Sequence, residues 1–267
     1  EHLAVEKLRP FEGHPFKVVD NEEMDQLTWS ILTQGLLTPL VVRPLPNGEY
    51  EVISGHRRLH ACKKAGIETV PALIYAIDRD AAAIALVDSN LQREHILPSE
   101  KAYAYMLKLE AMNHQGRTSG QVGQKWSRDE IAEGESGRQV QRYIRLTNLI
   151  PGILQKVDEG RIALTPAVEL SYLTDAEQED LLDTMESEDC TPSLSQAIQM
   201  KALSQSGQLD MDTIFHIMTQ PKANQQEKIS FKVSELRDFF PRHYTVAQMM
   251  QEIKVALKER QQRHARQ

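Results

Sequence analysis

The sequence predicts an α+β fold in which an N-terminal α/β domain precedes a mainly helical domain. Strand and helix patterns alternate through the first third of the chain, and helix patterns alone continue to about residue 205. A stretch rich in Gly, Ser and Gln at 113–128 reads as a loop or linker between helices. We therefore expect an α/β domain over 1–96, a helical domain over 97–205, and a linker with a C-terminal tail over 206–267.

The strands expected in the α/β domain are short. Residues 39–45, "PLVVRPL", and 49–53, "EYEVI", flank the tight turn "PNG", which is the pattern of two strands joined by a hairpin. Residues 67–75, "IETVPALIY", supply a later strand.

Helices are expected before, between and after these strands. The first begins near Asp20 and Asn21, either of which can cap it, and stops at Gly35. The second, "RRLHACKKA", ends at Gly66. The third covers 78–94 and is broken by the "ILP" that follows.

Helix patterns dominate the next part of the chain. We expect a helix from Ser99, a short helix over 129–133 and a longer one over 136–149, with further helices to about residue 205. The segment 206–227 is Gln-rich and weakly patterned, so no element is predicted there.

The C-terminal tail carries two weaker patterns. Residues 228–233, "KISFKV", suggest a strand, and 245–267 suggest a helix with a basic end. Three roles remain open for this tail: binding DNA, pairing with a second chain as an oligomerisation segment, or forming a solvated surface.

The net charge of −7 is distributed unevenly. Residues 162–227 carry 2 basic and 12 acidic side chains, whereas 117–161 carry 8 and 6, and 228–267 carry 9 and 4. A basic segment can contact phosphate even when the whole chain is acidic. The overall charge therefore does not exclude nucleic acid as a partner.

The cysteine count and hydropathy exclude several other classes of protein. Cys62 and Cys190 lie far apart without metal-ligand spacing, so neither a disulfide framework nor a zinc site is predicted. No stretch approaches the roughly 20 apolar residues that a membrane span needs. No secretion signal follows Glu1, and we expect a cytoplasmic protein.

The turn at Ser54–Arg58 combines features that attract an anion. It precedes the second helix, whose first N–H groups are unpaired and carry the positive end of the helix dipole. Gly55 allows a ligand to approach the backbone, and Arg57 and Arg58 supply charged donors. Phosphate fits this pattern. The alternative is that the glycine serves only the turn and the arginines pair with nearby carboxylates.

A second polar cluster lies near the end of the third helix. Ser89, Asn90 and Arg93 are three or four residues apart and so share one edge of the helix. Arg93 could clamp another phosphate while Asn90 places a metal or a sugar. Taken alone, the cluster fits the solvated face of an ordinary helix better than a binding site.

Taken in order, three stretches resemble the ParB family of chromosome and plasmid partition proteins. They are "LTQGLLTPLVVRP", which is similar to the first nucleotide motif, "SGHRRLHACKKAG", similar to the Gly-Glu-Arg-Arg phosphate motif, and "SNLQREHILPSEKAYAY", similar to the Glu-Asn-Leu-Gln-Arg motif. The resemblance covers most of residues 1–175. It implies a ParB/sulfiredoxin-like N-terminal domain that binds CTP with Mg²⁺, and a helix-turn-helix domain that binds double-stranded DNA.

The resemblance also implies site residues and partners. The nucleotide-binding residues it implies are Thr38, Gly55, His56, Arg57, Arg58, Ser89, Asn90 and Arg93. The expected assembly is a homodimer that can close as a clamp on DNA, with a ParA-type ATPase as a further partner. The expected function is plasmid or chromosome partition, and the expected location is the nucleoid or a plasmid.

Two residues depart from the family pattern. His56 stands where the phosphate motif has Glu, and Ser89 stands where the third motif begins with an acidic residue. Asp88 is one position away from that place. Since the family links this acidic residue to the metal and to hydrolysis, we expect nucleotide binding with slow or absent turnover. For His56, an exposed turn residue without a role is the alternative.

The candidate DNA-binding helix has two distinct faces. Val140, Tyr143, Ile144 and Thr147 fall on one side, which we expect to pack against the domain. Ser136 is placed to cap the helix, and together with the expected helix at 129–133 this is the layout of a recognition helix. The DNA-binding residues predicted on it are Ser136, Arg138, Gln139, Gln141, Arg142 and Arg145. A solvated face is the alternative.

Two other function classes remain to be weighed. A site-specific transcription regulator would use the same helix-turn-helix without a nucleotide switch, and His56 and Ser89 favour it. An enzyme such as a sulfiredoxin or a kinase could share the N-terminal fold. Sulfiredoxin needs a reactive cysteine where this chain has Gly55, and a kinase would not explain the arginine-bearing helix at 136–149.

Overall fold

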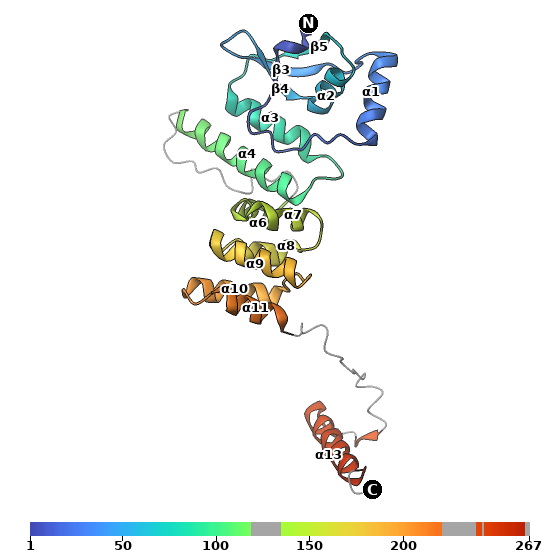
Figure 1. Cartoon of the computed structure of the whole chain (residues 1–267), viewed down its shortest axis with the longest axis vertical. Helices are drawn as coiled ribbons and strands as arrows, with labels where there is room; N and C mark the ends of the chain where they lie inside the picture. The colour runs from blue at the N-terminus through green and yellow to red at the C-terminus, as the bar shows by residue number, and fades with distance from the viewer. Residues whose placement is uncertain (119–134, 221–238, 242, 265–267) are drawn as a thin grey trace. The chain divides into compact units, whose positions relative to one another are not determined.

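The computed structural model describes residues 1–118, 135–220, 239–241 and 243–264. The chain forms two compact units, Glu1–Gln220 and Pro221–Gln267. The first unit contains the α/β region and the helices that follow it (Figure 1). No helix among the described residues is long and apolar enough to cross a membrane.

A five-stranded mixed sheet organises the N-terminal region, in the order β1-β5-β3-β4-β2. Its strands are β1 (His2–Ala4), β2 (Leu8–Pro10), β3 (Leu40–Pro44), β4 (Tyr50–Ser54) and β5 (Thr69–Ile74). β3 runs antiparallel to β4 and parallel to β5. The short β1 pairs antiparallel with β5, and β2 pairs parallel with β4.

Helices pack on both faces of this sheet because its side chains alternate between the two faces. Val42 and Val52 point into a core shared with α1 (Glu22–Gln34) and α2 (His56–Lys64). Val41 and Ile53 point into the opposite core, shared with α3 (Arg79–Leu91) and α4 (Pro98–Thr118). β4 ends at Ser54 and α2 begins at His56, so the turn between them leads directly from the sheet into this helix.

Local chemistry sets the ends of α1 as the sequence predicts. Of the two candidate caps, Asn21 is the N-cap, and its side chain accepts a hydrogen bond from the Met24 N–H at 3.0 Å. The helix ends at Gly35, which has a φ of 74°. This positive φ favours glycine over residues with a side chain.

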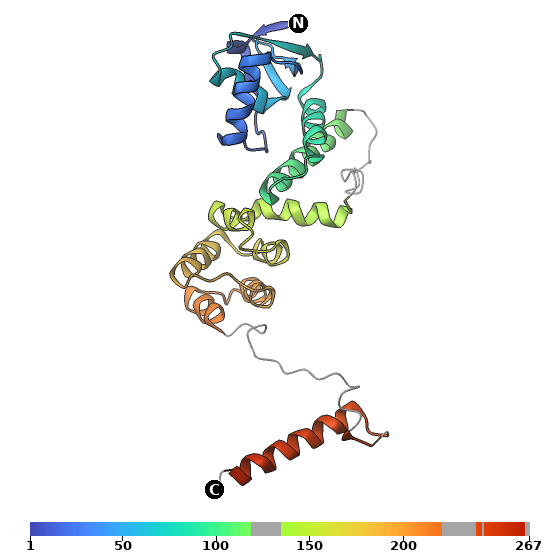
Figure 2. The same cartoon turned by 90° about the vertical axis from the view of Figure 1, so that its right-hand side faces the viewer.

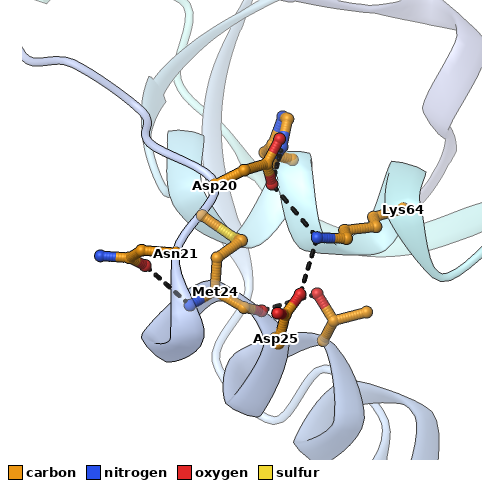
Figure 3. A network of polar contacts seen from close by, with 7 residues as sticks. Asp20, Asn21, Met24, Asp25 and Lys64 are labelled. Atoms are coloured by element: carbon orange, nitrogen blue, oxygen red, sulfur yellow. Dashed lines mark hydrogen bonds and ion pairs between the residues drawn. The ribbon is translucent and has the colours of Figure 1, made fainter.

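A polar network joins α1 to α2, the helix that follows the candidate anion turn (Figure 3). Lys64 Nζ lies 3.3 Å from Asp20 Oδ1 and 2.7 Å from Asp25 Oδ1, and His60 Nε2 lies 3.0 Å from the same Asp20 oxygen. These groups are well exposed, so the network contributes little free energy and mainly fixes how the two helices lie together.

The part of the first unit described after α4, residues 135–220, is helical (Figure 2). Its helices are α6 (Gly137–Arg145), η2 (Leu146–Asn148), α7 (Pro151–Asp158), α8 (Leu164–Leu170), α9 (Asp175–Ser187), α10 (Leu194–Gln205) and α11 (Met211–Thr219). They share one apolar core whose most buried members include Leu146, Ile153 and Leu181. α4 joins this core through Ala102, so it contributes to both the α/β and the helical regions.

The structure differs from the sequence expectations at three places. α4 continues to Thr118, so the first part of the predicted loop at 113–128 is helical. α11 occupies part of 206–227, and its Ile214 and Ile217 complete the helical core. β1, β2 and the short 3-10 helix η1 (Val5–Lys7) were not predicted at all.

Other expectations have different outcomes. The predicted short helix at 129–133 and the strand at 228–233 lie outside the described residues. In the second unit, α13 (Val246–His264) confirms the C-terminal helix. Its described side chains include the exposed Val246, Met250 and Val255.

Candidate functional site

A pocket of about 200 Å³ lies between the start of α2 and the end of α3. It brings together the two polar clusters that the sequence analysis singled out. Its lining residues are His14, Phe16, Lys17, Val18, Ser54, Gly55, His56, Arg57, Arg58, Ser89, Asn90 and Arg93. All the predicted nucleotide-binding residues line it except Thr38. The pocket therefore joins residues that are more than 30 positions apart in the chain.

Gly55 is required by the shape of the turn. Its φ is 104°, a conformation that residues with side chains rarely adopt. A Cβ at this position would lie 2.6 Å from Leu40 Cδ2, well inside contact distance. Within residues 1–118, no side chain caps the start of α2. The first N–H groups of α2 therefore remain available to a ligand at the positive end of the helix dipole.

Arg58 is held by the backbone that precedes β3. Its Nη1 donates to the carbonyl oxygens of Thr38, at 2.6 Å, and Pro39, at 2.8 Å. Burial lowers the pKa of Arg58, although the side chain stays charged at neutral pH. Thr38 thus contributes its carbonyl to the position of Arg58 and does not line the pocket itself.

Arg57 and Arg93 approach the pocket with fewer constraints. Arg57 Nη2 lies 3.0 Å from Glu23 Oε2 of α1, a pair in which both side chains are partly exposed. Arg93 follows α3, and its backbone N–H donates to the Asn90 carbonyl. Among the described residues, we find no ion pair to Arg93. Both guanidinium groups could therefore turn toward a phosphate.

The α3 side of the pocket presents neutral polar groups. Ser89 Oγ donates to the Leu86 carbonyl at 2.9 Å, and Asn90 Nδ2 donates to the same oxygen at 2.8 Å. The neighbouring Asp88 does not line the pocket, because its carboxylate pairs with Lys108 Nζ of α4 at 2.5 Å. Asp88 therefore does not replace the acidic residue that the family motif has in place of Ser89.

Two histidine rings lie in contact at the side of the pocket, tilted by 38° to each other. The rings of His14 and His56 have centroids 3.7 Å apart. His56 Nε2 accepts a hydrogen bond from the Phe11 N–H at 3.3 Å, which requires a lone pair on that nitrogen. Burial, with a smaller contribution from His14, lowers the pKa of His56 to about 3. His56 is thus a partly buried, neutral side chain, and the alternative of an exposed turn residue is wrong.

His14 also belongs to the pocket, although the sequence analysis did not select it. Its Nε2 is buried and, among the described groups, has no hydrogen-bond partner. Burial lowers the pKa of His14, and Arg93 adds to this effect while the Phe16 carbonyl opposes it. His14 is therefore neutral at pH 7 and leaves one ring nitrogen unpaired at the side of the pocket.

The segment that carries His14 is anchored on the helical region. The Lys17 N–H donates to Glu100 Oε1 of α4 at 2.8 Å, and Lys17 Nζ lies 3.5 Å from Asp158 of α7. In the sequence, this segment reads "HPFKV" and shows no helix or strand periodicity, so no local pattern predicts that it reaches the pocket. Its position depends on contacts with residues far away in the chain.

The region that carries the pocket is similar in sequence to known proteins. Residues 1–91 match the profile of the ParB N-terminal domain. The probable chromosome-partitioning protein ParB of Vibrio cholerae is 30% identical over 238 residues, which cover 88% of this chain and 77% of that protein. This chain belongs to the ParB family.

Further known proteins are similar to parts of this chain. The nucleoid occlusion protein of Geobacillus kaustophilus is 39% identical over 110 residues, but the match covers 41% of this chain and 39% of that protein. A Caulobacter crescentus ParB complexed with CTP-γ-S is 25% identical, with 70% of this chain and 98% of that chain covered and a TM-score of 0.33.

The predicted DNA-binding helix is α6. Three of the four residues expected on its packing face do pack, whereas the fourth, Thr147, lies in η2. Val140 is fully buried, and Tyr143 and Ile144 pack on the same cluster beside Tyr105 and Met112 of α4. Ser136 is the N-cap and accepts a hydrogen bond from the Gln139 N–H. The role of Ser136 in the structure is therefore to define where the helix begins.

The predicted outward face of α6 is only partly free. Arg138 is exposed. Arg142 Nη2 donates to Thr165 Oγ1 of α8 at 2.6 Å, and its Nη1 donates to Gln139 Oε1. Arg145 Nη2 donates to the Ser171 carbonyl at 2.6 Å. Two of the three arginines thus hold α6 against α8.

Proposed function

We propose that this ParB-family chain binds a nucleoside triphosphate, most simply CTP, in the pocket between α2 and α3, and binds DNA through α6. The observation that carries the first part is the convergence of Arg57, Arg58 and Arg93 on a helix start opened by Gly55. Guanidinium groups and unpaired N–H groups together favour a ligand with several phosphate oxygens.

CTP is the first nucleotide to test because the motifs that line the pocket resemble those of the ParB family. The pocket itself selects phosphates and does not specify the base. The proposal includes the partition role that the family resemblance implies, with a homodimer acting as a clamp on DNA and a ParA-type ATPase as a further partner. Residues 1–96 would then form the nucleotide domain and 97–205 the DNA-binding domain.

The proposal is tested by calorimetric titration with each of the four nucleoside triphosphates. We expect saturable binding of CTP by the parent chain. Arg93→Ala should weaken it by about tenfold or more, because a charge-assisted hydrogen bond contributes roughly 1.5–3 kcal/mol. Arg93 is suited to this test since its side chain forms no ion pair with the described residues, so its loss should not disturb the fold.

A matched control distinguishes the loss of a pocket residue from the loss of one positive charge anywhere on the chain. Arg161 is an exposed arginine that pairs with Asp189 outside the pocket, and Arg161→Ala should leave CTP affinity unchanged. If neither CTP nor another triphosphate binds the parent at millimolar concentration, with DNA present or absent, the nucleotide proposal fails. The function favoured by His56 and Ser89 is then a transcription regulator that uses α6 without a nucleotide switch.

A further inference from the structure

The charges around the candidate nucleotide pocket are all of one sign. Lys17, Arg57, Arg58 and Arg93 line it, and no Asp or Glu is among its described lining residues. His14 and His56, which also line it, are neutral for the reasons given above. A pocket with this composition offers a strong attraction to anions and no carboxylate oxygen to a metal ion.

The donor set does not fit the Mg²⁺ that the family resemblance implies. Mg²⁺ in a nucleotide site is usually bound through one or two protein carboxylates together with the phosphates. Within the described part of the chain, no group of three or more His, Cys, Asp or Glu residues could hold a metal ion. Glu23, Glu100 and Asp158 contact residues that line the pocket, and Asp88 lies next to one in the chain. Each of these four already has a partner, and Asp158 accepts hydrogen bonds from the Ser99 N–H and hydroxyl.

Those partners direct the carboxylates away from a metal. Asp88 pairs with the nearly buried Lys108, Glu100 accepts from the backbone N–H groups of Lys17 and Leu97, and Glu23 pairs with Arg57. A metal that recruited Asp88 or Glu100 would leave a buried lysine or backbone donors without a partner, which is unfavourable.

From this charge pattern we infer that the pocket binds its nucleotide as the metal-free anion and does so without Mg²⁺. The inference rests on the proposed function. Mg²⁺ would neutralise two of the phosphate charges, and four cationic side chains would then attract the ligand less strongly. In a site with a carboxylate, a bridge from protein through metal to phosphate compensates for that loss. Here the described lining offers no carboxylate for such a bridge.

The test compares CTP affinity by calorimetry in excess EDTA and in millimolar MgCl₂, with NaCl added to equalise ionic strength. We expect CTP to bind in EDTA at least as tightly as in Mg²⁺, and by up to about tenfold more tightly. Binding that is tenfold or more weaker in EDTA would overturn the inference and leave the proposed function intact. Failure to bind under both conditions would overturn both.

A pair of variants at Ser89 tests whether the lack of a carboxylate in the pocket is the reason for metal-free binding. Ser89→Glu places a carboxylate at the pocket, so it should weaken metal-free binding and make Mg²⁺ strengthen the affinity. Ser89→Gln has a similar size without the charge and should keep the parental ratio of the two affinities. The readout is the ratio of the CTP affinity in EDTA to the CTP affinity in MgCl₂, so hydrolysis need not be measured. Equal ratios in the two variants would show that position 89 does not face the phosphates, and would remove the proposed reason.

Discussion

At the scale of single residues, the buried His56 makes the free energy of unfolding of the chain depend on pH. A histidine whose pKa is lowered by burial binds fewer protons in the folded chain than in the unfolded chain. The unfolded pKa is near 6.5 and the folded pKa is about 3. The contribution of neutral His56 to stability is therefore fully present above pH 6.5 and decreases as the pH falls through this range toward 3.

We accordingly predict that the free energy of unfolding falls on acidification partly because of His56. Between pH 6 and 4.5 the parent should lose about 1 kcal/mol per pH unit more than His56→Gln, since one extra proton is taken up on unfolding. Urea unfolding at several pH values measures both slopes. His56→Gln can differ from the parent at pH 7, so the slope is the quantity to compare. Parallel slopes would contradict a neutral, buried His56.

The residues of the pocket also show which parts of the site local sequence patterns can predict and which they cannot. Gly55, Arg57 and Arg93 could be selected because helix starts and arginine spacing indicate phosphate by local chemistry. His14 could not, because it reaches the pocket only through the packing of residues 11–18 beside α2 and α4. The environment of Asp88 depends on Lys108, a residue of another helix, and is equally hidden from local patterns.

At the scale of elements, the same division between local and distant causes applies. The ends of α1 could be predicted because Asn21, through its side chain, and Gly35, through its backbone conformation, act on neighbouring residues of the same helix. The strands β1 and β2 are too short to show an alternating pattern, and each is a strand only because it pairs with β5 or β4. α11 is capped by Asp210, but it is held in place by its buried Ile214 and Ile217, whose burial depends on packing against other helices.

The element α6 carries the next prediction. Arg138 is exposed at its first turn, whereas Arg145 donates to the Ser171 carbonyl and stacks 4.0 Å above the Tyr172 ring. Arg138→Ala should cost about 1–3 kcal/mol of DNA affinity with relaxed specificity if it reads a base, or lower the salt slope by about 1 if it meets a phosphate. Arg145→Ala should chiefly lower the melting temperature, because α6 then loses a tie to the end of α8.

Fluorescence anisotropy with DNA recovered by selection and a thermal unfolding scan measure these two effects. Arg79→Ala, an exposed arginine at the start of α3, is the control for lost positive charge. If Arg138→Ala binds DNA like the parent while Arg145→Ala does not and keeps its melting temperature, the assignment of the outward face of α6 is reversed.

At the scale of the whole chain, charge is separated along the sequence. Residues 117–161 carry 8 basic and 6 acidic side chains, whereas 162–227 carry 2 and 12. The structure places several of these acidic groups on one exposed edge of α9, at Asp175, Glu179 and Asp183. An edge with this charge repels phosphate, and within the Debye length of about 8 Å at physiological salt the repulsion is not screened.

The final prediction is that DNA contacts α6 and avoids α9. A photo-crosslinking amino acid at Gln141 of α6 should form an adduct with bound DNA, and the same amino acid at Glu179 should not. Both positions lie on helices of the first unit, so the comparison does not depend on the second unit. Because removing the Glu179 charge slightly favours DNA, low crosslinking there is a stringent result. Adducts concentrated at Glu179 would mean that the acidic helices, despite a repulsive charge, form the DNA-binding surface, and α6 would then be only a packing element of the core.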